Sequence, residues 1–259
     1  MQERSPFGES CCLNCFSDDM EDLLKSQLPV TERNVSALFP DLTDIQPLKC
    51  GGMSVIYQAK CVETEAPVAL KVVSSDLDQQ LGRDRLVEEI NALMSLNHPN
   101  ILKINHGGVT QGGDGFLITE LVTGQTLAGA KRANKLSELT ITQIGIDLCA
   151  ALGYVHAQGM VHADVTPGNV MLTPAGEILL LDFGLVYEMS GAKKRSAMGT
   201  PYYLAPEQRG GLVLDHRVDV YGVGVLLYEM LVGQVPSPAL FVRPSRCDVD
   251  AGWDEILKR

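Results

Sequence analysis

The clearest hydrophobic pattern in the first half of the chain is a series of short runs rich in Val, Ile or Tyr. Three such runs, each bounded by glycine or polar breaks, cover Ile45–Cys50, Val55–Cys61 and Pro67–Val73. Alternation of apolar and polar residues with a period of two is typical of half-buried β-strands. Two further candidates, Ile101–Val109 and Phe116–Val122, flank a glycine-rich turn. This half is therefore predicted to form a β-sheet.

Helical spacing appears between the third and fourth predicted strands and then dominates the second half. Apolar residues spaced three or four apart predict a helix over Leu81–Leu96. Beyond Gly124, longer helices are predicted over Leu139–Gln158 and Arg217–Val232. A strand-rich half followed by a helix-rich half predicts an α+β protein of two lobes.

Residues 1–43 have a different character, being acidic and polar and interrupted by prolines. They are predicted to form an extension ahead of the folded core, with a short helical pattern at Met20–Leu28. Cys11, Cys12 and Cys15 cluster here, but a zinc site needs a fourth ligand. One interpretation is a set of solvent-accessible thiols, and the alternative is reversible lipid anchoring through palmitate.

Composition excludes several classes of protein. The 259 residues include 32 acidic and 21 basic side chains, giving a net charge of −11. Non-specific nucleic-acid binding needs clustered Lys and Arg, so no nucleic-acid partner is expected. No apolar run approaches the roughly 20 residues of a membrane span. Seven cysteines, an odd number, do not indicate a disulfide framework, so a cytoplasmic setting is expected.

Candidate phosphate chemistry lies in the strand-rich half. Gly51 and Gly52 stand in the turn between the first two strands, where backbone amides can approach a phosphate closely. Lys71 lies in an apolar strand, where its charge is costly unless it reaches an anion or a carboxylate. Glu89 on the following helix could supply that carboxylate, whereas Glu88 is expected to be solvated.

Candidate metal chemistry lies in the helix-rich half. Asp164 and Asn169 follow a long predicted helix, and Asp182 follows two short apolar strands, Val170–Leu172 and Ile178–Leu181. The two strands would carry Asn169 and Asp182 to one edge. Amide and carboxylate oxygens are ligands that a hard divalent cation prefers, so the pattern indicates a cation site.

Taken together, these residues resemble a eukaryotic-type (Hanks-type) Ser/Thr protein kinase, with bacterial members as the nearest in character. The resemblance covers about Ile45 to Arg259 and implies a bilobal kinase fold. It implies an N-lobe at 44–119, with a small antiparallel sheet and one helix, and a mainly helical C-lobe at 120–259 that lacks its last helices. The landmarks that carry it occur in order: Gly51-Gly-Met-Ser, Ala69-Leu-Lys71, Asn97-His-Pro-Asn, His162-Ala-Asp164, Asn169, Asp182-Phe-Gly, Gly199-Thr-Pro-Tyr-Tyr-Leu-Ala-Pro-Glu207 and Asp219-Val-Tyr-Gly.

The resemblance implies transfer of the ATP γ-phosphate to Ser or Thr hydroxyls of proteins, including the kinase itself, with ATP and Mg²⁺ as cofactors. Asp164 would be the catalytic base, and Lys71 would hold phosphates and pair with Glu89. Asn169 and Asp182 would bind the metal, and Asn169 would complete the catalytic set of Asp164, Lys71 and Glu89. The implied ATP-binding residues are Gly51, Gly52, Ser54, Ile56, Ala69, Lys71, Thr119, Glu120, Val122, Met171 and Asp182.

The chain also departs from the family pattern. Lys49 and Ser54 stand where the loop usually has glycines, so the phosphate-covering flap is expected to be stiffer. Ala163 replaces the arginine that normally pairs with an activation-loop phosphate, so activity is not expected to depend on such a phosphate through that pair. Thr166 replaces a lysine that steadies the γ-phosphate, which predicts slower turnover and predicts that Thr166→Lys raises or preserves activity.

These departures leave other functions open. A pseudokinase that serves as a nucleotide-binding scaffold or regulatory module is the main alternative. A small-molecule phosphotransferase of related fold is a further one, disfavoured because Gly199–Glu207 resembles a peptide-positioning segment. The arginine that normally pairs with Glu207 is missing, which suggests a fragment, a natural truncation, or completion of the lobe by another chain. Self-association is a separate expectation.

Overall fold

The computed structural model describes residues 32–50, 54–73, 80–133, 136–182, 187–188, 202–210, 214–236 and 249–257. These residues form two compact units, and the first includes the described residues up to Ser95 together with Lys103–Leu121. The second includes Leu96–Leu102 and the described residues from Val122 onward. Leu96–Leu102 lies inside the predicted first lobe. It joins the second unit through hydrogen bonds to β9, Ile178–Leu180. Asn100 Nδ2 donates to the carbonyl of Ile178, and the backbone amide of Leu102 donates to the carbonyl of Leu180, each over 3.0 Å.

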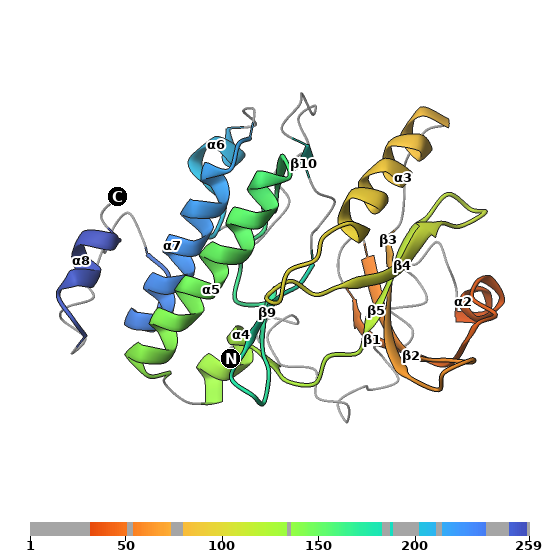
Figure 1. Ribbon diagram of the computed structural model, residues 1–259, viewed down its shortest axis with the longest axis horizontal. Coiled ribbons are helices and arrows are strands. Elements are labelled where there is room, and N and C mark those ends of the chain that lie inside the picture. The colour runs from red at the N-terminus through yellow and green to blue at the C-terminus, as the bar shows by residue number, and fades with distance from the viewer. Residues whose placement is uncertain are drawn as a thin grey trace, which may run out of the picture. The chain divides into compact units, whose positions relative to one another are not determined.

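The first unit is built on a five-stranded antiparallel sheet in the order β1-β2-β3-β5-β4 (Figure 1). All five predicted strands are confirmed. The starts of two strands differ by three residues. β1 begins at Leu42 and not at Ile45, and β4 begins at Ile104 because Ile101 makes an isolated parallel bridge to Leu180 instead of entering this sheet. The strands are β1 Leu42–Cys50, β2 Ser54–Cys61, β3 Pro67–Val73, β4 Ile104–Val109 and β5 Gly115–Glu120.

One face of this sheet is covered by a segment that the sequence placed in the extension. Helix α2, Glu32–Leu38, brings Val35 against the sheet with 1% of its surface exposed. Phe39 follows, and its ring lies edge-on to Phe116 with centroids 5.0 Å apart. The apolar core therefore begins before residue 44, because residues beyond the regular strands close this face. Strand side chains in this core are Val55, Tyr57, Ala59, Val68, Leu70 and Val72.

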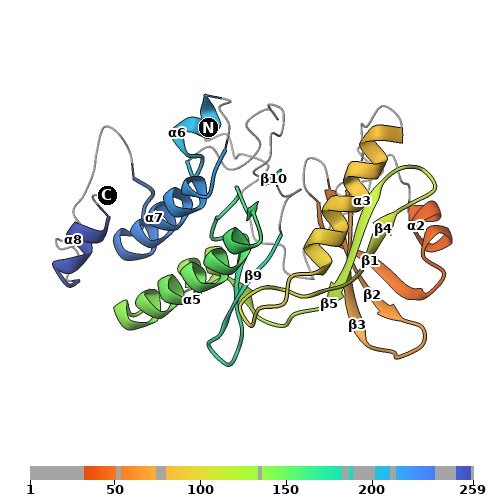
Figure 2. The same ribbon diagram turned by 45° about the horizontal axis from the view of Figure 1, so that its top comes forward.

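The opposite face is partly covered by helix α3, Gln80–Met94, which packs against β4 and β5. Gly107 of β4 allows this close approach. A Cβ atom there would lie 2.8 Å from Ile90 Cγ2 of the helix and 3.0 Å from Leu117 Cδ2 of β5. Ile90 and Leu117 thus meet on one side of the sheet. Figures 1 and 2 show α3 and α2 on different sides of the strands.

The second unit is organised around two long helices, α5 Glu138–Ala157 and α7 Arg217–Val232, which run side by side in both views (Figures 1 and 2). Both predicted helices are confirmed. Helix α5 begins where Ser137 Oγ accepts the amide of Thr140 over 3.1 Å. Helix α7 ends at Gly233, whose φ of 88° suits a glycine cap.

Short elements surround these helices. The sheet β6-β8-β9 contains the two predicted hairpin strands, and β10 pairs with β7. Within the ranges given above, none of the helices combines the length and apolar character needed to cross a bilayer. The helical pattern at Met20–Leu28 and the three N-terminal cysteines lie outside the described residues. The short elements are β6 Gln125–Thr126, α4 Leu127–Ala133, β7 Met160–Val161, β8 Val170–Leu172, β9 Ile178–Leu180, β10 Tyr187–Glu188, α6 Pro206–Arg209 and α8 Gly252–Ile256.

Candidate functional site

A closed ring of hydrogen bonds holds Asp164 in the second unit. The amide of Asp164 donates to His162 Nδ1 over 3.2 Å, and His162 Nε2 lies 3.0 Å from the carbonyl oxygen of Leu181. The amide of Leu181 donates to the carbonyl of Asn169 over 2.8 Å. Asn169 Nδ2 then closes the ring by donating to the backbone oxygen and to Oδ2 of Asp164, over 2.9 and 2.8 Å. The predicted catalytic carboxylate is therefore fixed at both its main chain and its side chain.

The protonation pattern of His162 follows from these bonds. Its Nδ1 accepts an amide hydrogen and so carries no proton, which assigns the ring proton to Nε2, the donor to Leu181. The side chain is fully buried, and each ring nitrogen has a partner. His162 therefore links the loop that carries Asp164 to the strand end that precedes Asp182.

The hairpin of β8 and β9 brings Asn169 and Asp182 to one edge, as the sequence predicts. Val170 pairs with Leu180, so the residues just outside the hairpin, Asn169 and Leu181, are neighbours and Asp182 comes next. Asn169 uses its amide nitrogen toward Asp164, which leaves the amide oxygen as the atom suited to a cation. The donor set fits a hard divalent cation. Among the described residues, His, Cys, Asp and Glu form no group of three that could hold a metal, at this edge or at any other place.

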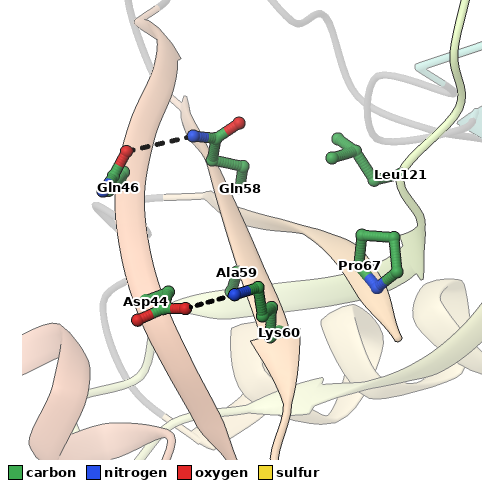
Figure 3. A pocket seen from close by; sticks show the side chains of 7 residues that line it. All are labelled: Asp44, Gln46, Gln58, Ala59, Lys60, Pro67 and Leu121. Atoms are coloured by element: carbon green, nitrogen blue, oxygen red, sulfur yellow. Dashed lines mark hydrogen bonds and ion pairs between the residues drawn. The ribbon is translucent and has the colours of Figure 1, made fainter. Parts of the chain in front are cut away.

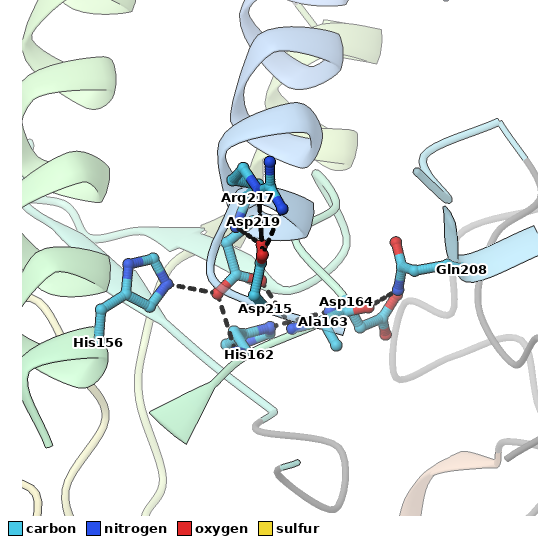
Figure 4. A network of polar contacts seen from close by, with 8 residues as sticks. All are labelled: His156, His162, Ala163, Asp164, Gln208, Asp215, Arg217 and Asp219. Carbon is cyan, nitrogen blue, oxygen red and sulfur yellow. Dashed lines mark hydrogen bonds and ion pairs between the residues drawn. The ribbon is translucent and has the colours of Figure 1, made fainter. Parts of the chain in front are cut away.

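Asp219 at the start of α7 anchors the loop from the other side (Figure 4). It is completely buried, and its Oδ1 accepts the amide of Ala163 over 2.7 Å. Its Oδ2 accepts the amide of His162 over 2.9 Å and faces His156 Nε2 of α5 at 2.7 Å. Three donors therefore compensate this buried charge.

Ala163 is held in an unusual conformation by this anchor. Its φ of 60° lies in the left-handed region, which costs a non-glycine residue about 1–3 kcal/mol. The bond to Asp219 helps to maintain that conformation immediately before Asp164. The sequence identified Asp219 only as a landmark and did not identify the role of His156. The signal that could have identified Asp219 was its position as a charged residue in the predicted apolar helix that became α7.

In the first unit, the side chains predicted to bind nucleotide share one face of the sheet. Ile56 lies opposite Lys71, and Ala69 lies opposite Thr119. Directly opposed residues point to the same side, and residues two apart along a strand do so as well, which adds Ser54. The sheet therefore presents a lysine at one position of a largely apolar face, and a threonine at another position of the same face.

Glu89 belongs to the helix that packs on this same face. Lys71 lies opposite Leu117, the β5 residue that meets Ile90 of α3 near Gly107. Glu89 directly precedes Ile90, and its Oε1 atom is shielded from solvent. The predicted pairing of Lys71 with Glu89 is therefore compatible with the face on which each residue lies.

A pocket of about 410 Å³ lies in the first unit, lined by residues of β1 and β2 together with Pro67 and Leu121 (Figure 3). Gln58, opposite Ala69 on the neighbouring strand, lines it together with Pro67 and Leu121. Its outer wall is polar, since Gln58 donates to Gln46 over 3.1 Å. The pocket lies next to the segment after β5, where the sequence predicts backbone contacts to a purine.

The remaining predicted residues are distributed as follows. Glu120 is exposed at the end of β5 and accepts a hydrogen bond from Thr119 Oγ1 at its backbone oxygen over 3.1 Å. Val122 and Met171 are half-buried and belong to the second unit, Met171 within β8. Gly51 and Gly52 lie outside the described residues, as does the segment Gly199–Pro201. Thr166 is buried, with 6% of its surface exposed.

Comparison with known proteins adds independent information. Residues 43–243 match the family described as protein kinase domain. A probable serine/threonine-protein kinase of Clostridium perfringens is 34% identical over 192 residues, covering 72% of this chain and 28% of that protein. The serine/threonine-protein kinase PknB of Mycobacterium leprae is 32% identical over 209 residues, covering 76% and 33%. PknL of Mycobacterium tuberculosis is 36% identical over 213 residues, covering 77% and 52%. The chain thus spans about a third or less of the first two relatives and about half of the third.

Proposed function

Because the chain belongs to the protein kinase domain family, we propose that it transfers the γ-phosphate of ATP to Ser or Thr hydroxyls of protein substrates. The observation that carries this proposal is the ring of hydrogen bonds around Asp164. A ring that fixes a carboxylate at both its backbone and its side chain suits a group that must orient and deprotonate a hydroxyl.

Each polar residue of the site has a proposed task. Asp164 accepts the hydroxyl proton of the substrate, and Asn169 orients Asp164 through its amide nitrogen. The Asn169 oxygen and Asp182 would hold Mg²⁺, which when bound would neutralise charge on the phosphates. Lys71 is proposed to hold the phosphates of ATP and Glu89 to orient Lys71. Family membership implies ATP and a divalent metal, and the choice of Mg²⁺ is part of the proposal.

The nucleotide base is proposed to bind against the face of the sheet that carries Ile56, Ala69 and Thr119. These side chains are small or apolar, as a flat purine ring requires. Glu120 would contribute backbone groups, and the family resemblance implies Val122 and Met171 of the second unit as further nucleotide contacts. Gly51, Gly52 and Ser54 are proposed to approach the phosphates from the turn after β1.

We further propose a cytoplasmic setting and protein substrates that include the chain itself. The absence of a disulfide framework in the sequence supports a cytoplasmic location. The chain itself is proposed as a substrate, and its own Ser and Thr residues make autophosphorylation measurable. Ala163 has only a methyl side chain, so we propose that activity does not require a loop phosphate to pair at this position.

The test is γ-phosphate transfer to a Ser/Thr peptide array with ATP and Mg²⁺, comparing the wild type with Asp164→Asn. The wild type should label peptides, and the variant should lose activity by roughly a hundredfold or more. Asp147→Asn, which changes a carboxylate on α5 away from the site, is the matched control and should retain activity. If the wild type and Asp164→Asn gave the same background level of phosphate transfer while both still bound nucleotide, the proposal would be rejected in favour of a nucleotide-binding scaffold.

A further inference from the structure

Gln208 connects two parts of the second unit that are far apart in sequence. It lies in the short helix α6, and only 9% of its surface is exposed. Its Oε1 accepts the amide of Ala205 over 2.8 Å, and its Nε2 donates to the carbonyl of Ala163 over 2.9 Å. The second bond spans 45 residues of sequence. Figure 4 shows the side chain pointing from α6 toward the loop that carries Asp164.

The carbonyl that Gln208 contacts belongs to the peptide group that enters Asp164. The oxygen of that peptide accepts from Gln208, and its N–H donates to His162 Nδ1. Both polar atoms of the peptide plane are therefore held by buried side chains. On the other side of Ala163, the preceding peptide N–H is held by Asp219. A residue with φ of 60° is thus fixed at both ends.

The chemistry of this contact requires a carboxamide of this length. The group must accept one hydrogen bond from Ala205 N and donate another to Ala163 O. A glutamate carboxylate would accept the first but repel the second, because it has no hydrogen to donate. A methionine would fill similar space without either bond. Packing alone would therefore accept other side chains of similar size at position 208, whereas the two hydrogen bonds require glutamine.

We propose that Gln208 is a positioning residue for Asp164, holding the peptide plane before the catalytic carboxylate and joining α6 to the catalytic loop. This inference rests on the proposed kinase activity. Gln208 does not touch the reacting atoms, so its effect passes through the orientation of Ala163 and Asp164. The strain at Ala163 makes this support necessary, since without it the peptide can relax to a more common conformation.

The test compares Gln208→Met and Gln208→Glu with the wild type in phosphate transfer to the best array peptide. Both should lower kcat about tenfold, which corresponds to the loss of one buried hydrogen bond, while KM for ATP changes less than about twofold. Gln143→Met is the control, because Gln143 is an exposed glutamine whose amide bonds only Asp147 in the described residues. It should leave both constants unchanged.

Relief of strain separates positioning from general stability. Ala163→Gly removes the cost of the left-handed conformation. In that background Gln208→Met should lower kcat by less than about threefold, relative to Ala163→Gly alone. The proposal would be overturned if Gln208→Met lowered kcat tenfold in both the wild-type and the Ala163→Gly backgrounds. It would also be overturned if the loss of activity were fully explained by a smaller fraction of folded protein.

Hydrogen exchange provides a readout that does not need activity. Peptides spanning Val161–Val165 should exchange at least about fivefold faster in Gln208→Met than in the wild type, and not in Gln143→Met. If exchange is faster in Gln208→Met but the wild type shows no phosphate transfer, the structural role of Gln208 is supported and the proposed kinase function is rejected. Unchanged exchange and unchanged kcat would reject Gln208 as a positioning residue. If Gln208→Met does not fold, Gln208→Glu carries the same two measurements.

Discussion

Asn169 Nδ2 lies 2.8 Å from Oδ2 and 2.9 Å from the backbone oxygen of Asp164, so one amide group holds both parts of the proposed base. The same residue receives the amide of Leu181 at its carbonyl. Asn169 therefore links the catalytic loop to the strand end before Asp182. Its side chain can orient a carboxylate with one atom while presenting an oxygen to a cation with the other.

Removal of this side chain should disable phosphate transfer more than it destabilises the fold. Asn169→Ala is expected to lower kcat by roughly a hundredfold, because the carboxylate loses its orientation and the cation loses a ligand. Steady-state kinetics at several Mg²⁺ concentrations measures the effect. Asn105→Ala, at an exposed position of β4, is the control and should behave as the wild type. Retention of activity within about threefold in Asn169→Ala would contradict the assigned role.

Asp219 should be among the most sensitive positions for stability. Its carboxylate is fully buried and accepts from two amides and His156, so Asp219→Ala leaves these donors without their partner. The expected loss in the free energy of unfolding is about 3–5 kcal/mol. Urea denaturation followed by circular dichroism measures it, with Asp147→Ala as the control. A loss below about 1 kcal/mol would show that water or relaxation replaces these bonds.

Two glycines of α7 should respond in opposite directions to the same substitution. A Cβ at Gly222 would lie 3.0 Å from Val165 Cβ and 3.2 Å from Val165 O, next to Asp164. Gly222→Ala should therefore destabilise by about 1–2 kcal/mol and lower kcat by displacing the loop.

At Gly224 a Cβ would meet no atom within 4 Å among the described residues. Gly224→Ala should stabilise by about 0.5–1 kcal/mol, because alanine loses less backbone entropy in a helix. Thermal unfolding of both variants provides the comparison. Destabilisation of similar size in both would show that close contact with Val165 is not the cause.

The ion pair of Asp215 and Arg217 at the start of α7 predicts a dependence on acid. Hydrogen bonds from Arg217, the shortest at 2.7 Å, lower the pKa of Asp215 from 3.8 to about 2. The lowered pKa means that the carboxylate contributes stability above its ordinary pKa. That contribution is lost as the pH falls through the value in the folded protein.

The free energy of unfolding of Asp215→Asn should therefore differ from that of the wild type by a constant amount above about pH 5, and most of this difference should be lost by about pH 2. The effect is expected to be small, because 76% of the Arg217 side chain is exposed to solvent. Urea unfolding at a series of pH values measures it. A difference that persists undiminished at pH 2 would assign the effect to a cause other than the ion pair.

Much of this fold could be predicted from local pattern. Alternation identified β3 at Pro67–Val73, and helical spacing identified α7 at Arg217–Val232, both with the bounds seen in the structure. The hairpin spacing also predicted that Asn169 and Asp182 share an edge. These features depend on residues close together in the chain, whose periodicity reflects which side faces the core.

The sequence by itself determined the elements, the family resemblance and the identity of Lys71, Asp164 and Asn169 as candidates. Tertiary structure alone decided that residues before position 44 close one face of the sheet and that Asp219 holds the catalytic loop. It also decided the contact of Gln208 with Ala163. The bonds of Asp219 and Gln208 to the loop join residues 45 to 57 positions apart, and no local periodicity records such pairs. A buried polar group reveals its partner only when the chain has folded, because its cost is offset by whichever distant donor or acceptor the packing brings within reach.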